Sequence, residues 1–159
     1  MKYRLLSKEQ FEALNKEFAT FLATQEITKQ DWELIKQNES DKVQRQLENF
    51  SDLVWEEVLG KTKYLEHYSA DSINLFYCQP EQMERIVVRV EKKGVNLLDK
   101  EDFNWFIDNS NDKSIQYFKG TKPYTAPRNE EIFKLIEQGA VLADGKLFKA
   151  IHQILNSKK

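Results

Sequence analysis

Cysteine and histidine are scarce in this chain of 159 residues: Cys78 is the single cysteine, and His67 and His152 are the only histidines. One cysteine excludes an intrachain disulfide and a multi-cysteine zinc site, and it removes any argument for secretion. Two histidines far apart in sequence, with no carboxylates singled out beside them, do not make a zinc site either. The sequence therefore predicts no resident metal and no cofactor.

Long apolar runs are also lacking. No stretch approaches the roughly 20 apolar residues that cross a bilayer, and the start MKYRLLSKEQ has no apolar run of signal-peptide length. We therefore expect a cytoplasmic protein without a membrane partner. Apolar residues nonetheless make up 40% of the chain and aromatic residues 12%, which is enough to build the core of one domain.

No catalytic motif is visible. His67 and Cys78 fall on neighbouring expected strands, and a thiol needs an adjacent base or positive charge to ionise near neutral pH. A single cysteine on a strand is more often a small buried hydrophobe, and no oxyanion-hole motif accompanies it. We expect a protein that is not an enzyme and has no small-molecule substrate, with a Cys78–His67 enzyme as a minor alternative.

The first third of the chain predicts three helices. Ser7 and Gln10 fit a capping box, after which apolar residues recur at spacings of three and four. Thr28 with Asp31 marks the start of a second, short helix. A third helix is expected over residues 40–60, with the glycine at its end acting as a left-handed cap.

After residue 60 the pattern changes to strands. The segments KTKYLEHY, SINLFYCQ and RIVVRVE are rich in aromatic and β-branched residues and are separated by turn-prone sequences. They predict an antiparallel meander in which Ile86, Val88 and Val90 share one face. A short helix capped by Asp99 follows.

The C-terminal segment is distinguished by its charge. Residues 1–112 carry 15 Lys/Arg against 22 Asp/Glu, whereas residues 113–159 carry 9 against 4. We therefore divide the chain into an acidic globular domain, residues 1–118, and a basic C-terminal extension, residues 119–159. The expected fold class is α+β, with N-terminal helices packed on a small antiparallel sheet and a C-terminal extension of short helices.

The extension is the candidate binding site. Its start is punctuated by Gly120, Pro123 and Pro127, so a short strand from residue 114 should give way to an extended stretch outside the sheet. Cationic side chains on such a backbone can follow a phosphate track while an aromatic ring stacks on an exposed base. The predicted RNA-binding residues are Lys119, Lys122, Tyr124, Arg128, Lys146, Lys149, His152, Lys158 and Lys159.

Three blocks also carry a family resemblance. MKYRLLSKEQFEALNKEFATFLATQEI, FSDLVWEEVLGKTKYLEHYSADSINLFYC and RIVVRVE resemble a family of short proteins of unassigned function from flavobacteria and their relatives. The chain is also similar to an accessory large-subunit ribosomal protein described for that lineage. This similarity implies a non-enzymatic protein of the large ribosomal subunit, with rRNA and neighbouring ribosomal proteins as partners and the basic segment reaching rRNA.

Two observations keep an alternative open. The net charge of −2 is low for a ribosomal protein, because each phosphate contact draws on a cationic side chain. The C-terminal helices could instead dock in a groove of another protein. A cytoplasmic protein-binding adaptor or regulator would use their apolar residues Ile132, Phe133, Leu135, Ile136, Leu147, Phe148 and Ile151.

Overall fold

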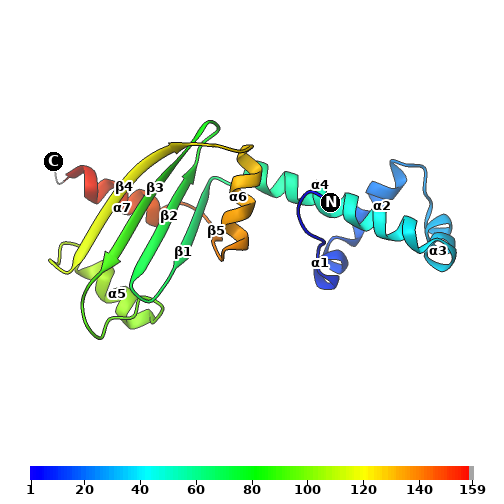
Figure 1. Cartoon of the computed structure of the whole chain (residues 1–159). Coiled ribbons are helices and arrows are strands. Elements are labelled where there is room, and N and C mark those ends of the chain that lie inside the picture. Colours follow the sequence, from blue (N-terminus) through cyan, green and yellow to red (C-terminus); the bar gives the residue numbers. More distant parts are fainter. Residues whose placement is uncertain (158–159) are drawn as a thin grey trace. The chain divides into compact units, whose positions relative to one another are not determined.

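A computed structural model describes residues 1–157, which form seven α-helices and five β-strands. The α+β class is therefore confirmed. The chain divides into two compact units, one over Met1–Gly60 and one that begins at Lys61. The first unit is helical, and the second contains the strands (Figure 1). The packing of the N-terminal helices on the sheet stays a prediction.

The first unit confirms all three predicted helix starts. Its elements are α1 (Lys8–Ala13), α2 (Asn15–Ala23), α3 (Lys29–Asn38) and α4 (Ser40–Lys61). Ser7 with Gln10, and Thr28 with Asp31, form complete capping boxes in which each side chain accepts a hydrogen bond from the backbone amide of the other residue. Each box satisfies two amide groups that a helix start leaves without partners.

Two predicted helix boundaries are wrong. The first helix breaks at Leu14, whose backbone (φ −102°, ψ 23°) ends α1 and begins α2. The third does not end at Gly60, because this glycine keeps a helical conformation and α4 continues to Lys61. A glycine lowers helix stability by about 1 kcal/mol without forcing a positive φ.

The second unit is built on an antiparallel sheet in the order β4-β3-β2-β1-β5. Its strands are β1 (Tyr64–Tyr68), β2 (Ser72–Cys78), β3 (Gln82–Val90), β4 (Ile115–Pro123) and β5 (Val141–Ala143). β1 to β3 form the predicted meander, and β4, which pairs with β3, corresponds to the short strand expected from residue 114. β5 was not predicted, because three residues show no periodicity; it pairs with β1 at the far edge of the sheet.

β4 is longer than predicted and stays in the sheet through Gly120 to Pro123. It is an edge strand, where a proline is tolerated because one side of the strand needs no ladder partners. The expected extended stretch outside the sheet is therefore wrong up to Pro123.

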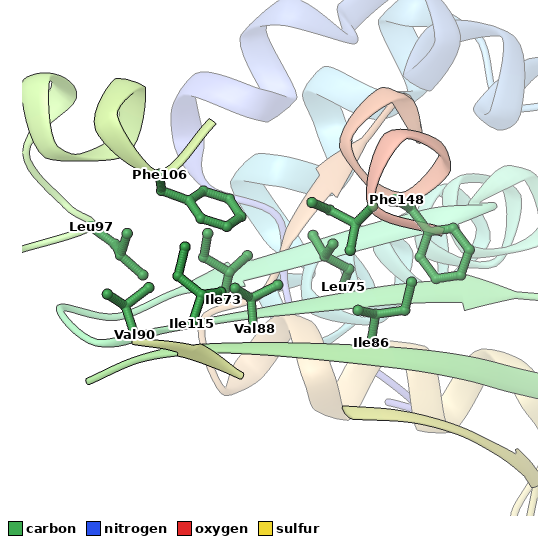
Figure 2. Packing of buried hydrophobic residues seen from close by; sticks show 10 residues of the cluster. Ile73, Leu75, Ile86, Val88, Val90, Leu97, Phe106, Ile115 and Phe148 are labelled. Carbon is green, nitrogen blue, oxygen red and sulfur yellow. The ribbon is translucent and has the colours of Figure 1, made fainter. Parts of the chain in front are cut away.

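One face of the sheet is covered by α5 (Lys100–Asp108) and α7 (Lys146–Ser157). Ile86, Val88 and Val90 point to this face and are buried, as predicted. Figure 2 shows Phe106 of α5 and Phe148 of α7 above the row of aliphatic side chains that the strands supply. We call this the inner face.

Residues beyond position 118 are integral to this unit. The predicted boundary between residues 118 and 119 falls within β4, and the segment after it supplies β5, α6 (Arg128–Glu137) and α7. Gly145 lets α7 begin close to the sheet: its φ is +86°, and a Cβ there would lie 2.5 Å from the Tyr64 ring. No helix within residues 1–157 is long and apolar enough to span a membrane.

Candidate nucleic-acid interface

The opposite face of the sheet, which we call the outer face, is only partly covered. Alternation along the strands places Phe76 and Arg85 here, on the side away from the buried inner residues. The cross-strand rows are Ser72–Arg89–Gln116, Asn74–Val87–Phe118, Phe76–Arg85–Gly120 and Cys78–Met83–Lys122. α6 lies beside this face on the side of β1 and β5 (Figure 1). The β4 ends of the cross-strand rows are therefore not covered by α6.

A groove of about 630 Å³ runs over the outer face between β4 and α6. Its floor is apolar and includes Phe76, Met83, Val87 and Phe118, and Leu135 of α6 lines its other side. A smaller hollow of about 320 Å³ adjoins it and shares Phe76 and Leu135 with it. We call the larger hollow the outer groove.

Four cationic residues line the outer groove: Arg85 of β3, Lys119 and Lys122 of β4, and Lys134 of α6. The ammonium of Lys119 lies 2.8 Å from His152 Nε2 of α7, which leaves the charges of the other three at the groove. The side chains of Lys122 and Lys134 form no hydrogen bond or ion pair within residues 1–157, although the charge of Lys122 helps to lower the pKa of Glu131. Their charges are therefore available to a bound anion.

Glu131 is the one acidic side chain that lines the groove in the described part of the chain. Its Oε1 accepts hydrogen bonds from the backbone amides of Thr125 and Ala126, at 2.5 and 2.9 Å, and from the Thr125 hydroxyl at 2.9 Å. Burial disfavours the ionised carboxyl, but these hydrogen bonds outweigh it and lower the pKa of Glu131. The carboxylate is thus held at the start of α6, and the groove keeps an excess of positive charge.

Arg85 is held in place over the groove floor. Its Nε donates to Oδ1 of Asn74 at 3.1 Å, its Nη2 donates to the same oxygen, and its guanidinium lies 5.6 Å from the centroid of the Phe76 ring. This is a cation–π distance. Within residues 1–157, Nη1 has no hydrogen-bond partner. A planar group fixed on one edge and open on the other is suited to bind a phosphate.

Phe118 is an exposed aromatic residue of the outer face, with 50% of its surface accessible. It lies opposite Val87 on β3, and Gly120 follows it on the same face of β4. A Cβ built on Gly120 would meet nothing within 4 Å, so open space adjoins the ring. An exposed ring on an open sheet can stack on a nucleic-acid base.

The predicted RNA-binding residues Tyr124 and Arg128 make contacts within the fold. The Arg128 guanidinium donates to the backbone carbonyls of Thr62, Cys78 and Gln79. The Tyr124 hydroxyl donates to the same Gln79 carbonyl at 2.7 Å. Burial is the main cause that raises the pKa of Tyr124 to about 12. Arg128 thus connects the start of α6 to the residues just before β1 and to the end of β2, and Tyr124 makes a second contact at the end of β2.

The predicted residues of α7 lie on the other side of the sheet from the outer groove. Lys149 Nζ is 5.5 Å from the centroid of the Tyr64 ring, and Lys146 pairs at 3.7 Å with the carboxylate two residues before it. His152 Nε2 is 2.8 Å from Nζ of Lys119, whose side chain therefore turns toward α7. Of the predicted set, Lys122 is the residue whose cation faces the groove.

Sequence reasoning missed Arg85, Phe118 and Lys134 as site residues. A usable signal was present for Arg85, because it alternates with the buried stripe of β3 and so must lie on the opposite face. Phe118 and Lys134 have no such local mark. Lys158 and Lys159 of the predicted set lie outside the described residues.

The Cys78–His67 alternative is not supported by the strand register. His67 lies opposite Asn74, four residues along β2 from Cys78, which corresponds to roughly 13 Å. Cys78 is buried, and this burial raises the pKa of its thiol to about 11. Among residues 1–157 no group of three or more His, Cys, Asp or Glu side chains is arranged to hold a metal ion.

Comparison with known proteins identifies the family. Neither a search of curated proteins nor a search of solved structures gives a match. The profile of a family described as being of unknown function, DUF6495, matches residues 1–156, and the chain belongs to that family.

Proposed function

We propose that the chain is a non-enzymatic RNA-binding protein that serves as an accessory protein of the large ribosomal subunit. The observation that carries RNA binding is the outer groove, where Arg85, Lys122 and Lys134 surround an apolar floor and the one carboxylate is already bonded within the chain. The ribosomal setting rests on the sequence resemblance alone.

The groove is suited to a polyanion for a physical reason. Each phosphate that a Lys or Arg side chain neutralises releases counterions, so binding weakens as salt rises. With about 0.7 per contact on a single strand, three contacts predict a slope near −2 for the logarithm of the binding constant against the logarithm of salt concentration.

The adaptor alternative draws less support. Ile132, Phe148 and Ile151 are almost fully buried within the chain. Phe148 and Ile151 belong to the core cluster of the inner face. These side chains are therefore occupied, and docking through them would disrupt the fold.

Truncation of residues 119–159 cannot test the proposal, because it would remove β5 and α7 from the fold. Two double variants with equal loss of charge are better suited. Lys122→Gln with Lys134→Gln changes the outer groove, and Lys146→Gln with Lys149→Gln changes α7 on the other side of the sheet.

The experiment measures co-sedimentation of the full chain with purified large subunits at low and high salt. With a slope of about 0.7 per contact, lowering the salt concentration from 1 M to 0.1 M raises the binding constant about fivefold for each phosphate contact. The groove variant loses two contacts, so we expect it to bind about 25-fold more weakly near 0.1 M salt. The α7 variant should bind nearly as well as the original chain.

Each other result contradicts a named part of the proposal. If the α7 variant loses more binding than the groove variant, the RNA contact lies on α7 and not in the outer groove. If the chain does not sediment with the large subunits at either salt concentration, the ribosomal role is contradicted.

A further inference from the structure

Resting on the proposed function, we infer that the outer groove binds RNA as a single strand, with one base stacked on Phe118 and the neighbouring phosphates held by Arg85 and Lys122. The inference names the form of RNA and the contacts, neither of which follows from positive charge alone.

The order of the side chains along β4 is the first support. Phe118, Gly120 and Lys122 alternate onto the outer face, so they succeed one another at about 7 Å, the distance between alternate strand residues. Arg85 on β3 lies opposite Gly120, so its backbone is level with the midpoint between Phe118 and Lys122, and its guanidinium lies over Phe76 on the groove floor. A strand of RNA laid along β4 would meet the ring first, then the guanidinium, then the lysine.

The position of the ring is the second support. Phe118 lies in the groove floor and makes no ring contact within residues 1–157, although half of its surface is exposed. Stacking on such a ring requires a base with a free face. Bases in a duplex are stacked on both sides by their neighbours, whereas those of a single strand can be splayed onto an aromatic residue.

The space beside the ring is the third support. Gly120 leaves the floor open between Phe118 and Lys122, since a Cβ there would touch nothing within 4 Å. Almost any other residue at this strand position would narrow the groove. Gly120 also lies opposite Arg85 on β3, and the Arg85 side chain lines the same groove.

An acidic peptide is the competing occupant, because it would match the same positive charge. It offers no planar ring to Phe118, and its affinity would not depend on an aromatic residue there. The experiment therefore includes a poly-glutamate peptide as a probe.

The test uses fluorescence anisotropy with the full chain and a short labelled RNA that has no self-complementarity, either alone or annealed to its complement. We expect the single strand to bind at least tenfold more tightly than the duplex. Phe118→Leu keeps an apolar side chain but removes the ring, and should weaken single-strand binding by at least about 5-fold, the lower end of the range found when a stacking aromatic residue is replaced by alanine. Phe118→Tyr should preserve binding.

Two further variants separate stacking from folding. Leu98→Ala changes another exposed apolar residue, 63% accessible and placed just before α5, and should leave binding unchanged. Gly120→Val adds a β-branched side chain that suits a strand, removes no charge and should weaken binding by filling the groove. Far-UV circular dichroism verifies that each variant is folded.

The outcomes distinguish the inference from the function on which it rests. Equal binding of single strand and duplex, with the Lys122→Gln, Lys134→Gln variant weakening both, would overturn the single-strand inference and leave RNA binding intact. Failure to bind either RNA would overturn both. If poly-glutamate binds as tightly as the RNA, the occupant of the outer groove is an acidic peptide and not RNA.

Discussion

Replacing Arg128 by methionine would test whether this residue supports the fold, as its contacts indicate, or binds RNA, as its charge suggests. Methionine keeps an unbranched side chain but removes the guanidinium. Three backbone carbonyls, of Thr62, Cys78 and Gln79, would then lose a charged donor. The Gln79 carbonyl would keep the Tyr124 hydroxyl at 2.7 Å, so its loss is partial.

The expected magnitude follows from these three bonds. A hydrogen bond to a charged group contributes about 1.5–3 kcal/mol to stability, and water can replace part of it where the site is only half-buried. With two carbonyls fully affected and one partly, we expect a loss of about 2–4 kcal/mol in the free energy of unfolding of the second unit. RNA affinity of the folded variant should change little.

Equilibrium urea unfolding followed by far-UV circular dichroism measures this loss. Hydrogen exchange read by mass spectrometry then shows whether faster exchange is concentrated at the ends of β1 and β2 and in α6, where the contacts of Arg128 lie.

Lys134→Met is the matched control, because it replaces a cation of the same helix by the same residue. Lys134 lines the groove and is exposed, so its loss should change stability by no more than about 0.5 kcal/mol and should weaken RNA binding. The reasoning would be refuted if Arg128→Met lost no more stability than Lys134→Met, or if it alone abolished RNA binding.

Three further predictions concern single contacts in the second unit. Gly145→Ala should lower the urea midpoint and Gly120→Ala should not, because the first has φ +86° and a Cβ position 2.5 Å from the Tyr64 ring, while the second has open space. Cys78 should not react with Ellman's reagent at pH 8 until urea unfolds the chain, since burial raises the pKa of its thiol to about 11. The pKa of Tyr124 is about 12 in the fold against about 10 when unfolded. The contribution of its neutral phenol to stability is therefore complete below pH 10 and is lost as pH rises towards 12. In urea titrations, Tyr124→Phe should lose less stability than the original chain between pH 9 and pH 11.

Each of these predictions has a clear contrary result. Equal losses from the two glycine variants would contradict the close approach of Gly145 to Tyr64. Labelling of Cys78 in the native chain at the rate of the denatured chain would show that the thiol is accessible. Parallel pH curves for Tyr124→Phe and the original chain would mean that the phenol ionises equally in both states.

Local features were predictable from the sequence because the groups that contact one another lie within a few residues along the chain. The capping boxes at Ser7 and Thr28 join side chains to amides three positions away, and the buried stripe of β3 follows from alternation along one strand. A helix or strand of this kind carries its own signal.

Long-range contacts were not predictable, for the same physical reason. Arg128 binds carbonyls of residues 50 and 66 positions earlier in the chain, Cys78 and Thr62, and nothing near position 128 indicates which carbonyls lie within reach. The charge of Lys122 was apparent in the sequence. The groove around it depends on the pairing of β3 with β4 and on the placement of α6, which only the fold reveals.

The pairing of β5 with β1 has a consequence for synthesis of the chain. β1 to β3 are complete by Val90, but β5, which pairs with the edge of β1, is complete only at Ala143. Phe148 and Ile151 of α7, which cover the inner face, are synthesised later still. At about 5–20 residues per second, a translating ribosome needs roughly 3–10 s to cover that interval. During this time the nascent sheet has an open edge and an uncovered apolar face, which are the features that promote aggregation. A prematurely ended chain would retain both defects, so we expect it to be a substrate for chaperones and proteases and not a shorter working protein.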